Sequence, residues 1–222
     1  MPTSSPLNVH SVLMLLTNLA PRRVLDVGCG FGKYGVLARE YLDVWDERIG
    51  RERWQTRIVG IEAFPAYRNP IHEYVYDAVH YGDASQVLPT IDGQFDVVLI
   101  LDVIEHLEKA AAQQLVRESF RRSAVVIVST PAEFYAQTAL CGNPFEMHRC
   151  HWTADDFEQG LSVRTFDLVA CNIFVASREQ LPAKVFALVD PADVVYLRSR
   201  NRLKTIGAPG SLLLKAVNRL FS

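Results

Sequence analysis

The chain has 222 residues, which suits one α/β domain with a short extension. Hydrophobic residues make up 49% of it and charged residues 22%, so a disordered or fibrous protein is excluded. The formal net charge of −2 disfavours a nucleic-acid-binding domain, and four widely spaced cysteines favour a reduced, cytoplasmic protein over a disulfide scaffold.

Short apolar strands alternate with helices along most of the chain. The first expected helix has apolar residues at helical spacing from Val9 to Leu19, and its basic residues come too late for a signal peptide. Five strands follow, at Arg23–Gly28, Arg57–Ala63, Val79–Gly82, Phe95–Leu101 and Ala124–Ser129. The helices between them are Lys33–Leu42, Asn69–Asp77, Ala84–Leu88 and Val103–Phe120. This alternation predicts an α/β fold in which a parallel sheet carries helices on both faces.

The pattern changes towards the C-terminal end. A long polar and aromatic connection, Glu133–Cys150, leads to Thr153, which is a good N-cap for a helix over Ala154–Gln159. The last two strands, Phe166–Ala170 and Ile173–Ser177, are so close in sequence that only a hairpin can join them. The sequence therefore predicts a doubly wound sheet of seven strands, mostly parallel, with an antiparallel C-terminal strand.

A glycine-rich turn follows the first strand and reads Asp26-Val-Gly28-Cys-Gly30-Phe-Gly32-Lys-Tyr-Gly35. Glycines at a strand-to-helix turn let the backbone come close to a ligand. The part from Gly30 to Gly35 matches the G-x-G-x-x-G pattern, so a nicotinamide dehydrogenase is one interpretation. However, acids stand at or just after the strand ends: Asp26, Glu62, Asp83 and Asp102. A ligand with a cationic end and hydroxyl groups explains these acids better than a diphosphate does.

The glycine turn, the acids after strands two and three, and the stretch Leu101-Asp-Val-Ile-Glu-His106 together resemble class I S-adenosylmethionine (SAM) methyltransferases of the small-molecule branch. The resemblance covers roughly residues 20–178. It implies a seven-stranded sheet, SAM as cofactor and methyl transfer as the activity.

The resemblance also implies a role for each acid. Glu62 is expected to accept hydrogen bonds from both ribose hydroxyls, Asp83 from the adenine amine, and Asp26 to face the methionine ammonium. The glycine backbone is expected to line the amino-acid end of the cofactor. The expected cofactor-binding residues are Asp26, Gly28, Gly30, Gly32, Glu62, Asp83 and Asp102. Each acid has a structural alternative as well, such as Asp83 capping a helix.

Two histidines are candidates for catalysis, as a general base for a hydroxyl acceptor or as a group that positions it. His106 ends a stretch that resembles the D-x-x-E-H segment beside the SAM sulfur in the family. His148 lies in Asn143-Pro-Phe-Glu-Met-His148, which resembles a segment that faces the acceptor pocket in relatives. Both could instead be packing residues. A zinc site would use Cys141, His148, Cys150 and His151, but their spacing fits no compact zinc pattern, so no metal is expected.

We therefore expect O-methylation of a small molecule, in a pocket whose walls include Asp43–Thr56 and Glu133–Cys150. The alternatives are a methyltransferase-like subunit that has lost catalysis and an NAD(P)-dependent oxidoreductase. No nucleic-acid partner is expected, and the sequence does not indicate an oligomeric state.

Two regions are expected along the chain. Residues 1–180 form the SAM-binding domain, with an acceptor-side loop at 131–152, and residues 181–222 form a basic, partly helical extension. Residues 191–222 hold six basic residues against one acid, Asp193. Residues 198–222 could contact an anionic membrane or lipid surface weakly; packing on the domain, a dimer contact and a frayed end are the other interpretations.

Overall fold

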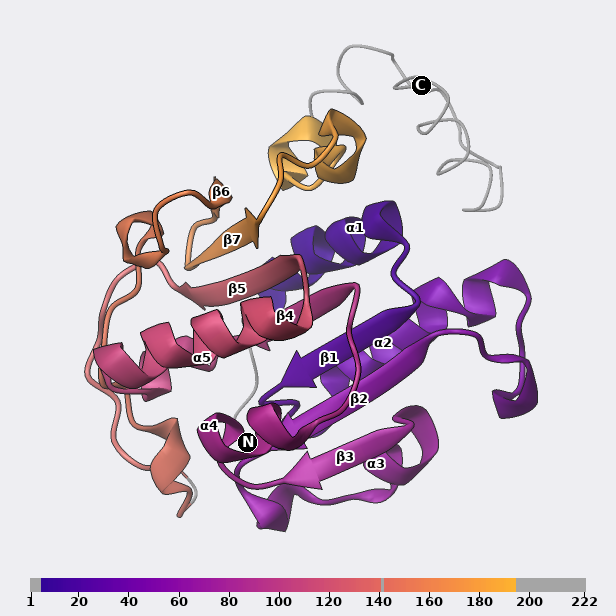
Figure 1. Cartoon of the computed structure of the whole chain (residues 1–222), viewed down its shortest axis with the longest axis horizontal. Helices are drawn as coiled ribbons and strands as arrows, with labels where there is room; N and C mark the ends of the chain where they lie inside the picture. Colours follow the sequence, from indigo (N-terminus) through magenta and orange to yellow (C-terminus); the bar gives the residue numbers. More distant parts are fainter. Residues whose placement is uncertain (1–4, 141, 195–222) are drawn as a thin grey trace.

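A computed structural model describes residues 5–140 and 142–194. Its seven-stranded sheet has the order β3-β2-β1-β4-β5-β7-β6 (Figure 1). The strands are β1 (Arg23–Val27), β2 (Arg57–Glu62), β3 (Ala78–Tyr81), β4 (Val97–Leu101), β5 (Val125–Pro131), β6 (Ser162–Asp167) and β7 (Cys171–Ser177). Only β7 runs antiparallel to its neighbours, β5 and β6, among the pairs of this sheet. This confirms the predicted seven-stranded, mostly parallel sheet.

Helices cover both faces of the sheet. They are α1 (Val9–Leu19), α2 (Lys33–Leu42), α3 (Pro70–Val75), α4 (Ala84–Val87) and α5 (Lys109–Arg122). Successive strand residues point to opposite faces, so Val24 and Val97 pack with α1 and α2, whereas Leu25 and Val98 pack with α5. The parallel strands β1 to β5 end on the same side of the sheet, so their carboxyl ends lie together there (Figure 1).

One predicted helix, Val103–Phe120, is wrong at its start. A 3-10 turn at Ile104–His106 comes first, and α5 begins only at Lys109. The physical reason is that the carbonyl of Glu105 accepts hydrogen bonds from the backbone N–H groups of Arg149 and Cys150, at 2.7 and 3.2 Å. That carbonyl is therefore engaged by a distant loop, which no local pattern indicates. The helix expected over Ala154–Gln159 likewise shortens to one 3-10 turn behind its Thr153 cap.

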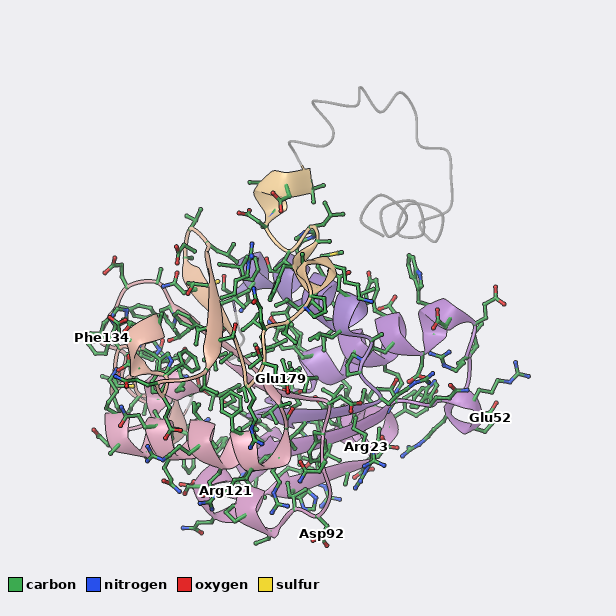
Figure 2. All side chains as sticks on the ribbon, turned by 45° about the horizontal axis from the view of Figure 1, so that its top comes forward. Arg23, Glu52, Asp92, Arg121, Phe134 and Glu179 are labelled. Atoms are coloured by element: carbon green, nitrogen blue, oxygen red, sulfur yellow. The ribbon has the colours of Figure 1, made fainter. Side chains whose placement is uncertain are left out.

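The insertion at Asp43–Thr56 does not form a wall of the ligand cavity, contrary to expectation. It joins the end of α2 to the start of β2, so it lies at the amino ends of the strands. Figure 2 shows Glu52 of this insertion and Phe134 of the loop after β5 at opposite ends of the molecule. The insertion is held by Asp43, a fully buried carboxylate that pairs with Arg39 at 2.7 Å and Arg48 at 3.0 Å.

Residues 183–189 pack against α1. Asn18 donates to the carbonyls of Val185 and Ala187 at 3.1 and 2.9 Å, Ser11 donates to that of Val189 at 2.7 Å, and the Val189 side chain is fully buried. The predicted basic helix within 198–222 lies outside the described residues. Among the helices that are described, none is both long and apolar enough to cross a membrane.

Candidate active site

A cavity of 690 Å³ lies at the carboxyl ends of the parallel strands. Its walls come from the N-terminal segment, the glycine turn, the ends of β2 and β4, and the loop after β5. All nine residues predicted to form the site line it: Asp26, Gly28, Gly30, Gly32, Glu62, Asp83, Asp102, His106 and His148. Residues from four separate strand ends are thus brought together, as expected for a parallel sheet.

The glycine turn carries the chain over the end of β2. The N–H groups of Gly28 and Cys29 donate to the carbonyl of Ile61, at 2.8 and 3.0 Å. Gly28 has φ +71°, and a Cβ there would lie 2.3 Å from a methyl carbon of Val103, so only glycine fits. The turn is therefore shaped by its packing, and its backbone forms one wall of the cavity.

Two of the predicted acids, Asp26 and Glu62, are deeply buried in the cavity wall, at 2% and 5% exposure. Burial raises the pKa of Asp26 to about 6, although a hydrogen bond from Tyr76 at 2.7 Å opposes this. Burial also raises the pKa of Glu62, whose oxygens each accept one backbone N–H, from Gly30 at 2.8 Å and Phe64 at 2.7 Å. These two amides fix the orientation of the Glu62 carboxylate within the cavity wall.

The other two predicted acids are also engaged by the protein. Asp83 caps α4, because one of its oxygens accepts from the N–H and hydroxyl of Ser85, at 2.8 and 2.6 Å. Asp102 accepts from Ser129 at 2.7 Å, from Asn8 at 3.3 Å and from the N–H of Ser5 at 3.2 Å. Asp102 thus anchors the N-terminal segment beside the cavity, a contact that the sequence did not reveal.

His106 and His148 lie side by side, with ring centroids 5.0 Å apart. The Nδ1 of His106 is 3.3 Å from the carbonyl of Met147, and the Nδ1 of His148 is 2.9 Å from that of Tyr135. A carbonyl can only accept, so each Nδ1 donates to it, and in the neutral form of each ring Nε2 carries the lone pair. Burial lowers the pKa of His106, and the neighbouring His148 adds to this effect. Together with Glu105, the two rings form a cluster whose three ligand atoms lie within 4.8 Å of one another.

Hydrogen bonds join the loop after β5 to the chain that follows β2. Asn143, which is 1% exposed, caps a 3-10 turn at Pro144–Glu146 and donates to Tyr67 at 3.1 Å and to Glu146 at 3.1 Å. The hydroxyl of Tyr67 in turn donates to Glu146 at 3.2 Å. This segment therefore joins the β5 side of the cavity to the chain that follows β2.

The zinc set considered from sequence is not brought together among the described residues. Cys150 is buried with its thiol 3.4 Å from the carbonyl of Ile104, and His151 contacts the carbonyl of Ala132 at 3.2 Å. Cys141 lies outside the described residues. The residues that could hold a metal ion are instead Glu105, His106 and His148, and the sequence alone indicated no role for Glu105.

The sequence also provided no indication that Lys33 and Tyr76 belong to the site. The Lys33 ammonium is half-buried at the start of α2, where burial lowers its pKa while Asp102 and Asp26 oppose the shift. Tyr76 is 2% exposed and packs so closely on Gly35 that a Cβ there would lie 2.3 Å from its ring. Gly35, the last glycine of the apparent G-x-G-x-x-G pattern, is therefore required by the packing of the Tyr76 ring. Its presence does not indicate a bound dinucleotide.

This sheet order, with a glycine turn after β1 and acids at successive strand ends, defines the class I SAM-dependent methyltransferases. Residues 7–171 match a family described as a methyltransferase domain, and the chain belongs to that family. The chain thus carries a SAM-dependent methyltransferase domain, and the dehydrogenase interpretation is wrong.

Similar proteins agree with this class. Ajmaline N-methyltransferase from Rauvolfia serpentina is 30% identical over 112 residues, which cover 49% of this chain and 36% of that protein. An O-methyltransferase family protein from Burkholderia thailandensis shares the fold with a TM-score of 0.52 and 16% identity, over 78% of this chain and 56% of that one. Magnesium protoporphyrin IX methyltransferase from Synechocystis PCC 6803, solved with bound S-adenosylhomocysteine, has a TM-score of 0.51 and 17% identity, over 76% and 81%.

The cavity fits SAM on its own chemistry. SAM carries an ammonium, a sulfonium, a ribose diol and an adenine, and the cavity offers buried carboxylates at Asp26 and Glu62 together with a side-chain-free glycine wall. A buried carboxylate is stabilised by a cation or by hydroxyl donors, which SAM supplies. The hydrogen-bond donors of SAM and the acceptors of the cavity therefore match.

Proposed function

We propose that this enzyme transfers the methyl group of SAM to a hydroxyl of a small-molecule acceptor. The observation that carries the proposal is the pair of imidazoles, His106 and His148, which lie side by side and both line the cavity. A neutral imidazole can take the proton of a hydroxyl or hold its oxygen in place. The cavity, at 690 Å³, has the size of a small-molecule site and has room for a cofactor and a small acceptor.

The cofactor end of the cavity is assigned on the contacts already described. We propose that Glu62 binds the ribose diol, since its two oxygens are held in place by backbone amides. Asp26 faces the ammonium, and the free side of Asp83 receives the adenine amine. The backbone of the turn at Gly28, Gly30 and Gly32 lines the amino-acid end. Asp102, in contrast, contributes indirectly, because it holds the N-terminal segment in place beside the cavity.

The chain's own contribution to the reaction is positional. When bound, SAM supplies a methyl group that passes to the acceptor oxygen while the sulfur keeps the electron pair of the broken bond. The loop from Ala132 to Trp152 places His148 opposite His106, so the acceptor oxygen is held on the imidazole side of the cavity. Most of the rate acceleration in such a transfer comes from holding the reactants in contact and in line.

Methyl transfer from labelled SAM to a panel of hydroxyl and amine acceptors tests the proposal. Hydroxyl acceptors should be methylated, and His148→Ala should lower turnover by about 10²–10⁴-fold while leaving S-adenosylhomocysteine affinity nearly unchanged. Thr153→Ala, in the same region but outside the cavity wall, is the control. An amine acceptor is the second candidate, favoured by the similarity to ajmaline N-methyltransferase, and methylation of amines alone would replace the hydroxyl proposal.

A further inference from the structure

Three groups with metal-binding atoms meet beside the acceptor side of the cavity: Glu105, His106 and His148. Their ligand atoms lie within 4.8 Å of one another, so an ion between them would be at most about 2.8 Å from each. Metal–nitrogen and metal–oxygen bonds of about 2.0–2.2 Å need each side chain to move inwards by roughly 0.7 Å. Such a shift lies within ordinary side-chain adjustment.

The two histidines are already in the form that binds metals. Each Nδ1 faces a backbone carbonyl, of Met147 for His106 and of Tyr135 for His148, at 3.3 and 2.9 Å. Metal-bound histidines in proteins commonly donate their second ring N–H to a carbonyl in this way, which fixes the tautomer and the ring orientation. In the neutral rings the lone pair is therefore on Nε2, so a metal ion could bind there without a change of tautomer.

Glu105 provides an independent observation. Its side chain is 3% exposed, and its Oε2 is a buried oxygen with no hydrogen-bond partner. Buried polar atoms are almost always paired, so an unpaired carboxyl oxygen calls for an unseen partner. A proton on that oxygen would itself need an acceptor, which the surrounding atoms do not provide. A cation satisfies it directly.

We propose that Glu105, with the Nε2 atoms of His106 and His148, binds a divalent first-row transition ion in the wall of the cavity. Two imidazoles and one carboxylate suit Zn²⁺, Mn²⁺ or Fe²⁺, whereas Mg²⁺ and Ca²⁺ prefer all-oxygen sites. Three protein ligands leave coordination positions open towards the cavity, which is the arrangement of catalytic rather than structural metal sites.

The ion would take the place of a free histidine base. Resting on the proposed transfer to a hydroxyl, the acceptor oxygen would bind an open position of the ion, and its proton would be released to water as the oxygen gains the methyl group. A metal ion lowers the pKa of a bound hydroxyl and orients it at the same time. The histidines then position the acceptor through the ion.

Direct metal binding tests the inference. The full chain, without a histidine tag, is freed of metal with a chelator and titrated with Zn²⁺, Mn²⁺ or Mg²⁺ in separate calorimetric runs. We expect one equivalent of Zn²⁺ or Mn²⁺ per chain and much weaker Mg²⁺ binding. Co²⁺ should give a single visible absorption spectrum, because its bands report the geometry of the ligands around it.

Two ligand variants and one control variant test the assignment of the ligands. Glu105→Gln keeps the shape of the buried side chain, and His148→Ala changes a half-buried loop residue, so both should fold. Each should weaken Zn²⁺ binding by at least about 100-fold, since even outer partners of ligands contribute about 10–100-fold. His151→Ala is the matched control, because His151 lies in the same loop but outside the cluster, and its affinity should stay near wild type. Failure of the wild-type chain to bind any transition ion, or equal binding by wild type and Glu105→Gln, overturns the site.

The outcome is separable from that of the proposed function. If the ion binds through these residues but only amine acceptors are methylated, the metal site holds and the hydroxyl proposal falls. If metal-free protein methylates hydroxyl acceptors at the full rate and no ion binds on titration, the hydroxyl proposal holds and the metal site falls.

Discussion

Asp26 is the buried carboxyl whose charge state should control cofactor affinity. Its pKa is raised to about 6, so the ionised form that pairs with an ammonium is present above that pH and is lost as the pH falls. We predict that S-adenosylhomocysteine affinity is flat above pH 7 and falls towards tenfold per pH unit below about 6. Calorimetry at pH 5, 6 and 7 measures this. Glu62, whose pKa is also raised, contributes the dependence that remains in Asp26→Asn, and an equal slope in that variant would contradict the assignment.

Glu62 should be the acid on which cofactor binding depends most. Its two oxygens are oriented by the amides of Gly30 and Phe64, and each keeps a lone pair for a diol in a largely buried position. Glu62→Ala should lower S-adenosylhomocysteine affinity by about 1–3 kcal/mol, because buried hydroxyls would lose their acceptor. Calorimetry against Asp92→Ala, an exposed acid that does not line the cavity, provides the comparison. Unchanged affinity in Glu62→Ala would exclude it as the ribose ligand.

The residues that line the cavity could be predicted from the sequence, whereas the contacts that these residues make could not. The glycine turn and the acids Asp26, Glu62 and Asp83 follow strands with strong apolar patterns, and strand ends converge in a parallel sheet. In contrast, the link from Asp102 to Asn8 spans 94 positions, and Glu105 meets His148 only through a folded loop. Local patterns carry no information on such pairs, so the buried Glu105 cluster was not predicted.

The fully buried side chain of Asn8, together with the N–H of Ser5, attaches the N-terminal segment and α1 to the cavity wall. Asn8 donates to Asp102 at 3.3 Å and to Ser129 at 3.2 Å, and accepts from the hydroxyl of Tyr34 at 2.6 Å. We predict that Asn8→Ala lowers the free energy of unfolding by about 1–3 kcal/mol, because it leaves buried polar atoms unpaired. Urea denaturation should show this, whereas Thr17→Ala, which removes a bond within α1, should stay within about 0.5 kcal/mol.

The loop after β5 should control the acceptor rather than the cofactor. Tyr67 holds this loop by accepting from Asn143 at 3.1 Å and donating to Glu146 at 3.2 Å. Tyr67→Phe removes both bonds and keeps the ring, so His148 would lose part of its positioning. We predict that kcat/KM for the acceptor falls about tenfold or more, since small misplacements are costly in a reaction that depends on proximity. Steady-state kinetics with calorimetry would reject this role if cofactor affinity fell instead and the acceptor kinetics did not change.

The protein as a whole closes the cavity with segments from distant parts of the chain, including Ser5, the glycine turn, Glu62 and the loop around His148. A ligand that contacts all of them binds the folded chain and not the unfolded one. At 100 times its dissociation constant it should therefore add about 2.7 kcal/mol to the free energy of unfolding. For a chain of this length that raises the melting temperature by about 5–10 °C.

We predict this rise with S-adenosylhomocysteine and none with NAD⁺, because the acids at the strand ends repel a diphosphate. Differential scanning calorimetry measures both, and a comparable rise with NAD⁺ would contradict the cofactor assignment of the cavity.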